Sequence, residues 1–144
     1  EAFAGRNCIP YIWNNLQGAH DRGYRIAAAG YRVVLCPVTN LYFDLAYNAD
    51  PEEPGLYWGG YNSERDAWEF DPGTMFPPGN DGRSEEVRKN AMTNILGLQA
   101  QLWHETIKDE YRMEYYLLPK LAAFAERCWS PAPVCVASAT SSTW

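Results

Sequence analysis

Two short stretches of the sequence each place an aromatic residue and a carboxylate two positions apart. Trp103 and Glu105 end the stretch "ILGLQAQLWHE", and Tyr42 and Asp44 lie in "LYFDLAY". Both pairs follow or continue apolar runs typical of strands, in which alternate side chains point to the same face. Each pair can therefore present a ring and an acid to one side. Rings give a ligand flat apolar walls and carboxylates accept hydrogen bonds from hydroxyl groups, so the combination suits a sugar.

The alternation along 95–103 predicts one apolar face and one polar face. In an open sheet the polar face would simply meet solvent. In a barrel it would look inward, towards a ligand site at the C-terminal ends of the strands. Trp13 ends an earlier apolar stretch and adds a third aromatic residue at a strand end. The predicted apolar face comprises Leu96, Leu98, Ala100 and Leu102, and the polar face Gln99, Gln101, Trp103 and Glu105.

Three segments have the composition of strands, and the sequence between the first two indicates a parallel arrangement. Residues 21–29 suit a short helix that Gly30 ends, which gives a strand–helix–strand unit. The three strand segments are 8–13, 31–38 and 95–103.

Longer irregular and helical segments follow. Residues 48–82 are rich in Pro, Gly, Asp and Asn and read as a long loop, with a helical turn or two within 63–70. Residues 113–129 predict an amphipathic helix with Pro119 in its first turn. We expect a loose tail over 134–144. The apolar face predicted for the helix comprises Leu117, Leu121, Phe124, Ala125 and Cys128.

Composition excludes several classes of protein. The 144 residues carry a net charge of −6 without a basic cluster, so nucleic acid is not expected as a partner. No apolar run approaches the ~20 residues of a membrane span. Neither the two histidines nor the four cysteines have the spacing of a metal site, and we predict no metal and no cofactor. Disulfides among Cys8, Cys36, Cys128 and Cys135 stay open, and so does a purely structural role for the many aromatic residues.

Four motifs together resemble glycoside hydrolase family 20, the β-N-acetylhexosaminidases. They are "NLYFDLAY", "PEEPGLYWGGY", "LGLQAQLWHET" and "LPKLAAFAERCWSPAP", in the family's order, and the resemblance covers about residues 10–133. It implies an α/β fold, a partial (β/α)8 TIM barrel that comprises about the last three strands with their helices. Residues 1–133 would then be the C-terminal part of a catalytic barrel.

The resemblance also implies roles for individual residues. Tyr42 resembles the tyrosine that holds the carbonyl of the sugar's acetamido group, and Trp13 and Trp103 resemble walls around the acetamido methyl. Asp44 and Glu105 resemble the acids that bind hydroxyls of the terminal sugar, and Trp58 resembles a residue that stacks on the next sugar. Each of these residues could instead be structural. Trp13 and Trp103 could fill the core, Asp44 and Glu105 could be structural caps, and Trp58 could only fix its loop.

The family's catalytic Asp-Glu pair has no counterpart in this sequence. Asp109-Glu110 is the one such dipeptide, and it lies past the third strand, where acids are typical of a helix start. The pairs Glu52-Glu53 and Glu85-Glu86 match no better. We therefore expect an exo-acting hydrolase fragment for N-acetylhexosamine-terminated glycans or chito-oligosaccharides that is inactive alone.

Such a fragment needs the remaining half of the barrel, or it self-associates through its open sheet edges. Two alternatives are a non-catalytic carbohydrate-binding remnant and an assembly piece of a split hydrolase. Enzymes of this family usually work outside the cytoplasm, so we expect a secreted, periplasmic or lysosomal location.

Overall fold

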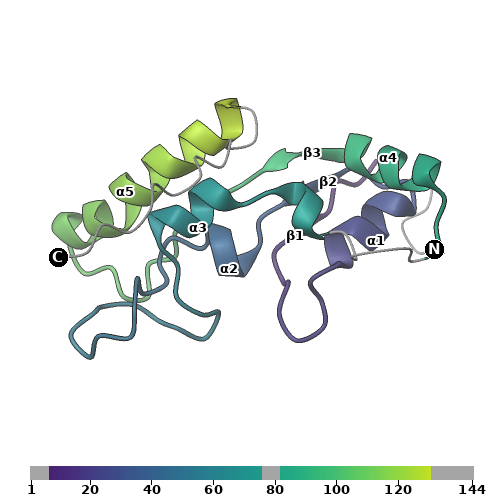
Figure 1. Ribbon diagram of the computed structural model, residues 1–144. Helices are drawn as coiled ribbons and strands as arrows, with labels where there is room; N and C mark the ends of the chain where they lie inside the picture. Colours follow the sequence, from purple (N-terminus) through teal and green to yellow (C-terminus); the bar gives the residue numbers. More distant parts are fainter. Residues whose placement is uncertain (1–6, 76–81, 131–144) are drawn as a thin grey trace, which may run out of the picture.

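The computed structural model describes residues 7–75 and 82–130, in which a three-stranded parallel sheet is covered by helices (Figure 1). The strands lie in the order β1-β2-β3, and both pairings are parallel, as the sequence predicts. The expected tail over 134–144 lies outside the described residues. The strands are β1 (Tyr11–Ile12), β2 (Val33–Leu35) and β3 (Ile95–Leu98).

The helices gather in two groups along an elongated body. Figure 1 shows α1 beside α4 at one end and α3 beside α5 at the other, with the sheet between them. The helical elements in the described ranges are α1 (Arg22–Ala28), α2 (Val38–Leu41), α3 (Glu64–Glu69), the 3-10 turn η1 (Pro72–Met75), α4 (Glu85–Thr93) and α5 (Glu110–Trp129).

The first helix begins and ends where the sequence predicts. Asp21 occupies the position before α1 and forms an ion pair with Arg25 at 3.2 Å. Gly30 follows the end of the helix with φ +90°, a left-handed conformation that glycine adopts without strain. The chain then turns back into β2, which completes the parallel unit.

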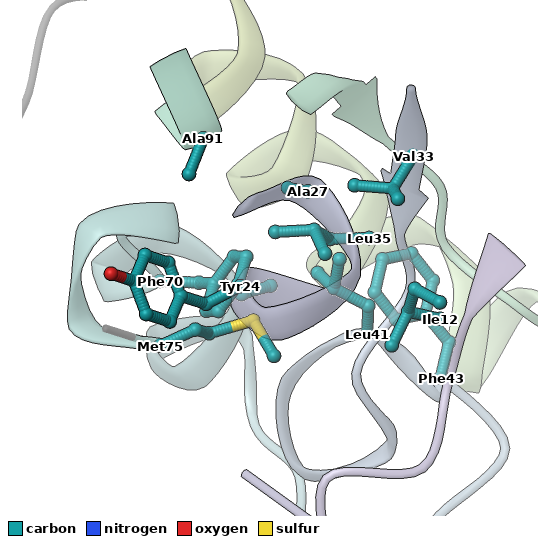
Figure 2. Close-up of a cluster of buried hydrophobic side chains, with 11 residues drawn as sticks. Ile12, Tyr24, Ala27, Val33, Leu35, Leu41, Phe43, Phe70, Met75 and Ala91 are labelled. Carbon is teal, nitrogen blue, oxygen red and sulfur yellow. The ribbon is translucent and has the colours of Figure 1, made fainter. Parts of the chain in front are cut away.

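One buried apolar core joins the sheet to both groups of helices. Figure 2 shows Leu35, Leu41 and Phe43 close to Ile12 of β1, with Tyr24 of α1 nearby. Because these side chains come from strands and helices alike, burying them fixes the direction of the strands and therefore where their C-terminal ends lie. The buried members of the core are Ile12, Tyr24, Ala27, Val33, Leu35, Leu41, Phe43, Ala67, Phe70, Met75 and Ala91.

A register shift in β3 corrects the predicted alternation. Val33 pairs with Ile95 but Val34 pairs with Gly97, so one extra residue is accommodated between them. Leu96 is consequently 40% exposed, and Ile95 packs against the core in its place. Beyond the shift the prediction holds, because Leu98, Ala100 and Leu102 all pack against the core.

The last helix starts earlier than predicted and places its proline internally. Helix α5 begins at Glu110, so Pro119 lies in its interior and not in its first turn. Proline has no N–H group, which leaves the carbonyl of Tyr115, four residues earlier, without a helical donor. The Tyr47 hydroxyl donates to that carbonyl at 3.0 Å. A side chain from the loop therefore replaces the bond that the proline removes.

The buried face of α5 also differs from the predicted one. Leu117 and Phe124 pack against the core as expected, but Leu121, Ala125 and Cys128 are exposed. The helix is fixed instead by the face that carries Tyr116, Leu117, Lys120, Ala123 and Phe124.

Helix α4 follows the loop expected over 48–82, in residues for which the sequence predicts no helix. Ser84 accepts a hydrogen bond from the backbone N–H of Val87, and Glu85 and Glu86 occupy the first turn. Acids there are favoured by the helix dipole, so these two residues have a structural place. Helix α3, in contrast, confirms the helical turn expected within 63–70.

Among the described residues, no helix has the length and apolar content that a membrane crossing needs. Cys8, Cys36 and Cys128 are free thiols. Cys135 lies outside the described residues.

Candidate functional site at the strand ends

The predicted aromatic residues lie together at the C-terminal ends of the strands. Tyr42 is central: its ring centroid lies 6.5 Å from Trp13, 6.0 Å from Trp58 and 6.2 Å from Trp103. Trp13 and Trp58 also meet edge to face at 6.4 Å. We call these four residues the aromatic cluster. Tyr42 is buried, whereas each tryptophan is about half exposed (45–52%), so the cluster presents open ring surfaces over a buried hydroxyl-bearing ring.

Backbone pairing that continues past the strands places the cluster. The carbonyl of Trp13 accepts from the Val38 N–H at 3.0 Å. Gln101 donates to the Leu41 carbonyl and accepts from the Phe43 N–H, both at 2.8 Å. Tyr42 is thereby paired alongside Gln101, two residues before Trp103.

Asp44 is 5% exposed and is held at the same edge. Its Oδ1 accepts the backbone N–H of Trp103 at 3.2 Å. Burial raises the pKa of this carboxyl, the charge of Glu105 raises it further, and hydrogen bonds and Lys120 oppose the change. Asp44 is therefore a buried acceptor that the backbone N–H of Trp103 holds in place.

Glu105 lies nearby but in a more open setting. Its side chain is exposed, and with Gly55 and Thr106 it lines a depression beside the aromatic cluster's strand ends. The two acids predicted to share a ligand are thus electrostatically coupled, one buried and one exposed. His104, between Trp103 and Glu105, is exposed.

The surroundings of Tyr42 keep its hydroxyl protonated. Burial raises its pKa, and the nearby Cys36 and Asp44 raise it further, against a hydrogen bond from the Trp103 side chain that lowers it. Tyr42 is therefore a hydrogen-bond donor at neutral pH. Cys36 is a site neighbour that sequence reasoning missed: it is buried, hydrogen-bonds to Gln101, and burial raises its pKa.

The most consequential residue missed from the sequence is Lys120. Its side chain is fully buried, and its Nζ donates to the carbonyls of Phe43 and Leu45, each at 2.9 Å. These carbonyls flank Asp44 on both sides. The ammonium also lies 3.9 Å from the centroid of the Tyr47 ring. The motif "LPKLAAFAER" carried this lysine, but an isolated Lys in a helix normally indicates a surface position.

The other acids near the site have structural partners. Asp109 caps α5 by accepting the Arg112 N–H at 2.7 Å, which confirms the structural interpretation of the Asp109-Glu110 dipeptide. Among the described residues there is no group of three or more metal-binding side chains. Glu53 has both oxygens engaged, by the Tyr47 N–H and the Tyr115 hydroxyl.

Comparison with known proteins defines the class. Residues 1–132 match the model of the glycosyl hydrolase family 20 catalytic domain. The chain belongs to this family. It is 33% identical over 140 residues to a β-hexosaminidase of Vibrio vulnificus and 32% identical over 139 residues to an N,N'-diacetylchitobiase of Vibrio harveyi. These alignments cover 91% and 90% of this chain but 16% of each relative, so the chain spans about a sixth of their length.

Solved structures give the same picture. The chain superposes with a TM-score of 0.68 and 29% identity on an exo β-N-acetylglucosaminidase of Vibrio harveyi in complex with N-acetylglucosamine. With a β-N-acetylhexosaminidase of Streptomyces coelicolor the TM-score is 0.64 and the identity 28%. The matches cover 91% and 85% of this chain, and 19% and 23% of those chains.

Proposed function

We propose that this chain is the C-terminal part of the catalytic barrel of an exo-acting β-N-acetylhexosaminidase and forms about half of its sugar site. The observation that carries the proposal is the aromatic cluster with a buried, protonated Tyr42 at its centre and Asp44 beside it. The substrates would be glycans or chito-oligosaccharides that end in N-acetylglucosamine or N-acetylgalactosamine, acted on outside the cytoplasm.

The aromatic cluster suits an acetamido group. Trp13 and Trp103 provide apolar surface on either side of Tyr42, which a methyl group can contact without meeting polar atoms. The Tyr42 hydroxyl then donates to the acetamido oxygen. A tyrosine hydroxyl is protonated at neutral pH, and burial, which raises the pKa of Tyr42, extends that range further towards alkaline pH.

Catalysis in this scheme is assisted by the substrate. The acetamido oxygen attacks the anomeric carbon while the bond from that carbon to the leaving oxygen breaks. A carboxylic acid elsewhere in the barrel gives its proton to the leaving oxygen, and the ring closed on the sugar is a positively charged oxazolinium. Water then attacks the anomeric carbon and reopens that ring, giving up a proton to the carboxylate formed in the first step, and the sugar leaves with its original configuration. Tyr42 fixes the attacking oxygen in line.

The acids hold the rest of the sugar. Asp44 accepts a hydroxyl through the oxygen that Trp103 leaves unused, and Glu105 accepts another from the open side. Trp58, 52% exposed at the outer rim of the aromatic cluster, stacks on the next sugar. An acid pair beside half-exposed rings is suited to a hydroxyl-rich ligand with one apolar substituent.

The partial-barrel reading is supported by both flanks of the sheet. Beside β1 an apolar depression is lined by Ile9, Ile26 and Tyr31, and at β3 a depression of mixed character is lined by Gly97, Leu98 and Arg127 among others. On α5, Leu118 and Leu121 are also exposed. Strands and helices of the remaining barrel would cover such surfaces.

The experiment that tests the proposal is hydrolysis of a chromogenic β-N-acetylglucosaminide by the purified 144-residue chain, with its intact mass checked in the same sample. We expect no release, because Asp109 caps α5 and no other Asp-Glu pair is present. Release that follows the pure chain through chromatography would contradict the proposed division of the site.

The sugar-binding half of the proposal has its own measurement. Quenching of tryptophan fluorescence by N-acetylglucosamine, reduced in Trp103→Ala, would support a binding surface in this chain. Binding without hydrolysis even when the rest of the barrel is supplied would favour a carbohydrate-binding remnant. Absence of binding together with defined self-association in solution would favour an assembly piece.

A further inference from the structure

The structure contains a buried cation that the proposed sugar chemistry does not use. Lys120 of α5 is fully buried, and each of its three N–H directions has a partner: the Phe43 carbonyl, the Leu45 carbonyl and the face of the Tyr47 ring. Burying an ammonium group is costly unless it is fully coordinated. The lysine therefore holds the backbone of the segment that coordinates it, residues 43–47.

That segment is the one that carries the site. Phe43 and Leu45 are the immediate neighbours of Asp44, and Tyr42 precedes them. Without Lys120 both carbonyls would be buried with no donor from α5, and the peptide that precedes Asp44 and the peptide that follows Leu45 could rotate. Two hydrogen bonds from one nitrogen fix both planes and so restrain the backbone segment that carries Tyr42 and Asp44.

Pro119 and Tyr47 complete the attachment. Because Pro119 lacks an N–H, the Tyr115 carbonyl accepts the Tyr47 hydroxyl at 3.0 Å, and the same Tyr47 ring lies under the ammonium. Glu53 accepts from the Tyr47 N–H and from the Tyr115 hydroxyl, which ties the loop to the helix a second time. Tyr115 and Lys120 of α5 therefore both hold the segment that contains Tyr47, through hydrogen bonds and through the cation–π contact.

We propose that Lys120 is a positioning residue of the sugar site, which acts by holding the Phe43 and Leu45 carbonyls so that Tyr42 and Asp44 stay beside the tryptophans of the aromatic cluster. The identity of the bound sugar rests on the proposed function, whereas the contacts of Lys120 with the Tyr42–Leu45 segment do not depend on it. Under this proposal a residue of α5, which itself does not contact the sugar, influences the affinity of the site for an N-acetylhexosamine.

The first test follows the indole N–H signals of the 144-residue chain by NMR in Lys120→Met and in Lys89→Met, a matched change at an exposed lysine of α4. We expect the Trp103 and Trp58 signals to move in Lys120→Met only, with the distant and 90% exposed Trp129 as internal reference. Signals of Trp103 and Trp58 that coincide with those of the wild type would overturn the proposal.

A second measurement needs no substitution, in case Lys120→Met fails to fold. Burial lowers the pKa of Lys120 to about 8, so raising the pH from 7 to 9 removes most of its charge in the wild-type chain. The neutral amine keeps two N–H groups but loses the charge that strengthens its bonds to the two carbonyls and its contact with the Tyr47 ring. The Trp103 and Trp58 signals should then shift with a midpoint near that pKa, and an absence of any shift would overturn the proposal. The titratable and charged groups that act on Lys120 are Asp44, Tyr47, Glu53, Glu64, Asp66 and Tyr116.

The third test uses the sugar. Lys120→Met should weaken binding of N-acetylglucosamine about tenfold, the equivalent of one charge-assisted hydrogen bond. Val33→Ala, which removes buried methyl groups from β2 away from the site, should lower stability without that loss. Equal losses in the two variants would overturn the proposal. If the wild-type chain binds no sugar, the proposed function fails, and the indole signals still decide whether Lys120 positions the site.

Discussion

The backbone N–H of Trp103 donates to Oδ1 of Asp44 at 3.2 Å, so an acid that follows β2 is fixed by the residue that follows β3. This bond joins two site residues that are 59 positions apart in sequence. Because the bond uses the backbone of Trp103, the ring of this residue can face Tyr42. The site is therefore a property of the sheet's edge and not of either segment alone.

Tyr42→Phe is the most direct test of the chemistry in an active protein that contains this segment. Removing the hydroxyl removes the donor to the acetamido oxygen as charge develops, so kcat should fall on the order of 10²-fold. Because the ring remains, the contacts with Trp13 and Trp103 should persist and KM should change little. An unchanged kcat would exclude the assigned role.

Glu105→Gln separates sugar binding from chemistry. The exposed acid is expected to hold a sugar hydroxyl, so the variant should raise KM roughly tenfold while stability stays close to that of the wild type. Steady-state kinetics and thermal unfolding, measured in parallel on the same active protein, check both parts. An identical kcat/KM would show that Glu105 does not contact the substrate.

Gly55→Ala tests how closely α5 approaches the site loop. A Cβ at Gly55 would lie 2.8 Å from the Tyr116 hydroxyl and 2.9 Å from the Ala46 nitrogen, and φ is +111°. Gly60→Ala is the control, because Gly60 has φ +98° on the same loop but nothing within 4 Å of its Cβ. Urea unfolding should show a loss larger by about 1–3 kcal/mol at Gly55 than at Gly60. Equal losses would mean that only backbone strain matters.

A double-mutant cycle tests the replacement of a helical hydrogen bond by Tyr47. Tyr47→Phe leaves the Tyr115 carbonyl without its donor and should cost about 1–3 kcal/mol. Pro119→Ala restores a backbone N–H to that carbonyl, so it should recover more stability in the Tyr47→Phe background than in the wild type. Additive effects in the cycle would contradict a shared acceptor.

The depressed pKa of Lys120 predicts how stability changes with pH. The folded value is about 8 and the ordinary value 10.5, so between them the unfolded chain binds more protons and stability rises with pH. Below pH 8 burial of the charge costs the folded state on the order of 3 kcal/mol, a cost that disappears above pH 10.5. The unfolding free energy of the wild type minus that of Lys120→Met should therefore increase from pH 8 to pH 10. A constant difference would mean that Lys120 is not buried as a cation.

The parallel sheet and the strand-end residues could be predicted because their signals are local. Alternation and the helix between the first two strands indicate parallel strands, and C-terminal strand ends in a parallel sheet lie at one edge. Trp13, Tyr42 and Trp103 consequently meet as the sequence suggests. The register shift at Gly97 could not be foreseen, since Leu96 is as apolar as Leu98 and only the pairing with β2 distinguishes them.

Features of α4 and α5 could not be predicted, because they depend on contacts with residues distant in the sequence or on weak local patterns. Helix α4 buries little apolar surface, with Ala91 as its buried residue, so periodicity was weak although Ser84 and two first-turn acids marked its start. The presence of Pro119 predicted that the helix starts near it. Inside α5 the hydrogen bond that the proline removes is replaced by one from Tyr47, which is distant in the sequence. Lys120 is buried only because three groups from that same loop coordinate it.

The distance along the chain between Lys120 and its acceptors affects how the protein is made. Lys120 follows Phe43 by 77 residues and Leu45 by 75. At ~5–20 residues per second, a ribosome adds the lysine about 4–15 s after those acceptors. During that interval the nascent chain already carries Tyr42 and Asp44 but not the group that orders them. Any product released early, before α5 is synthesised, would keep the residues of the proposed sugar site without the lysine that orders them.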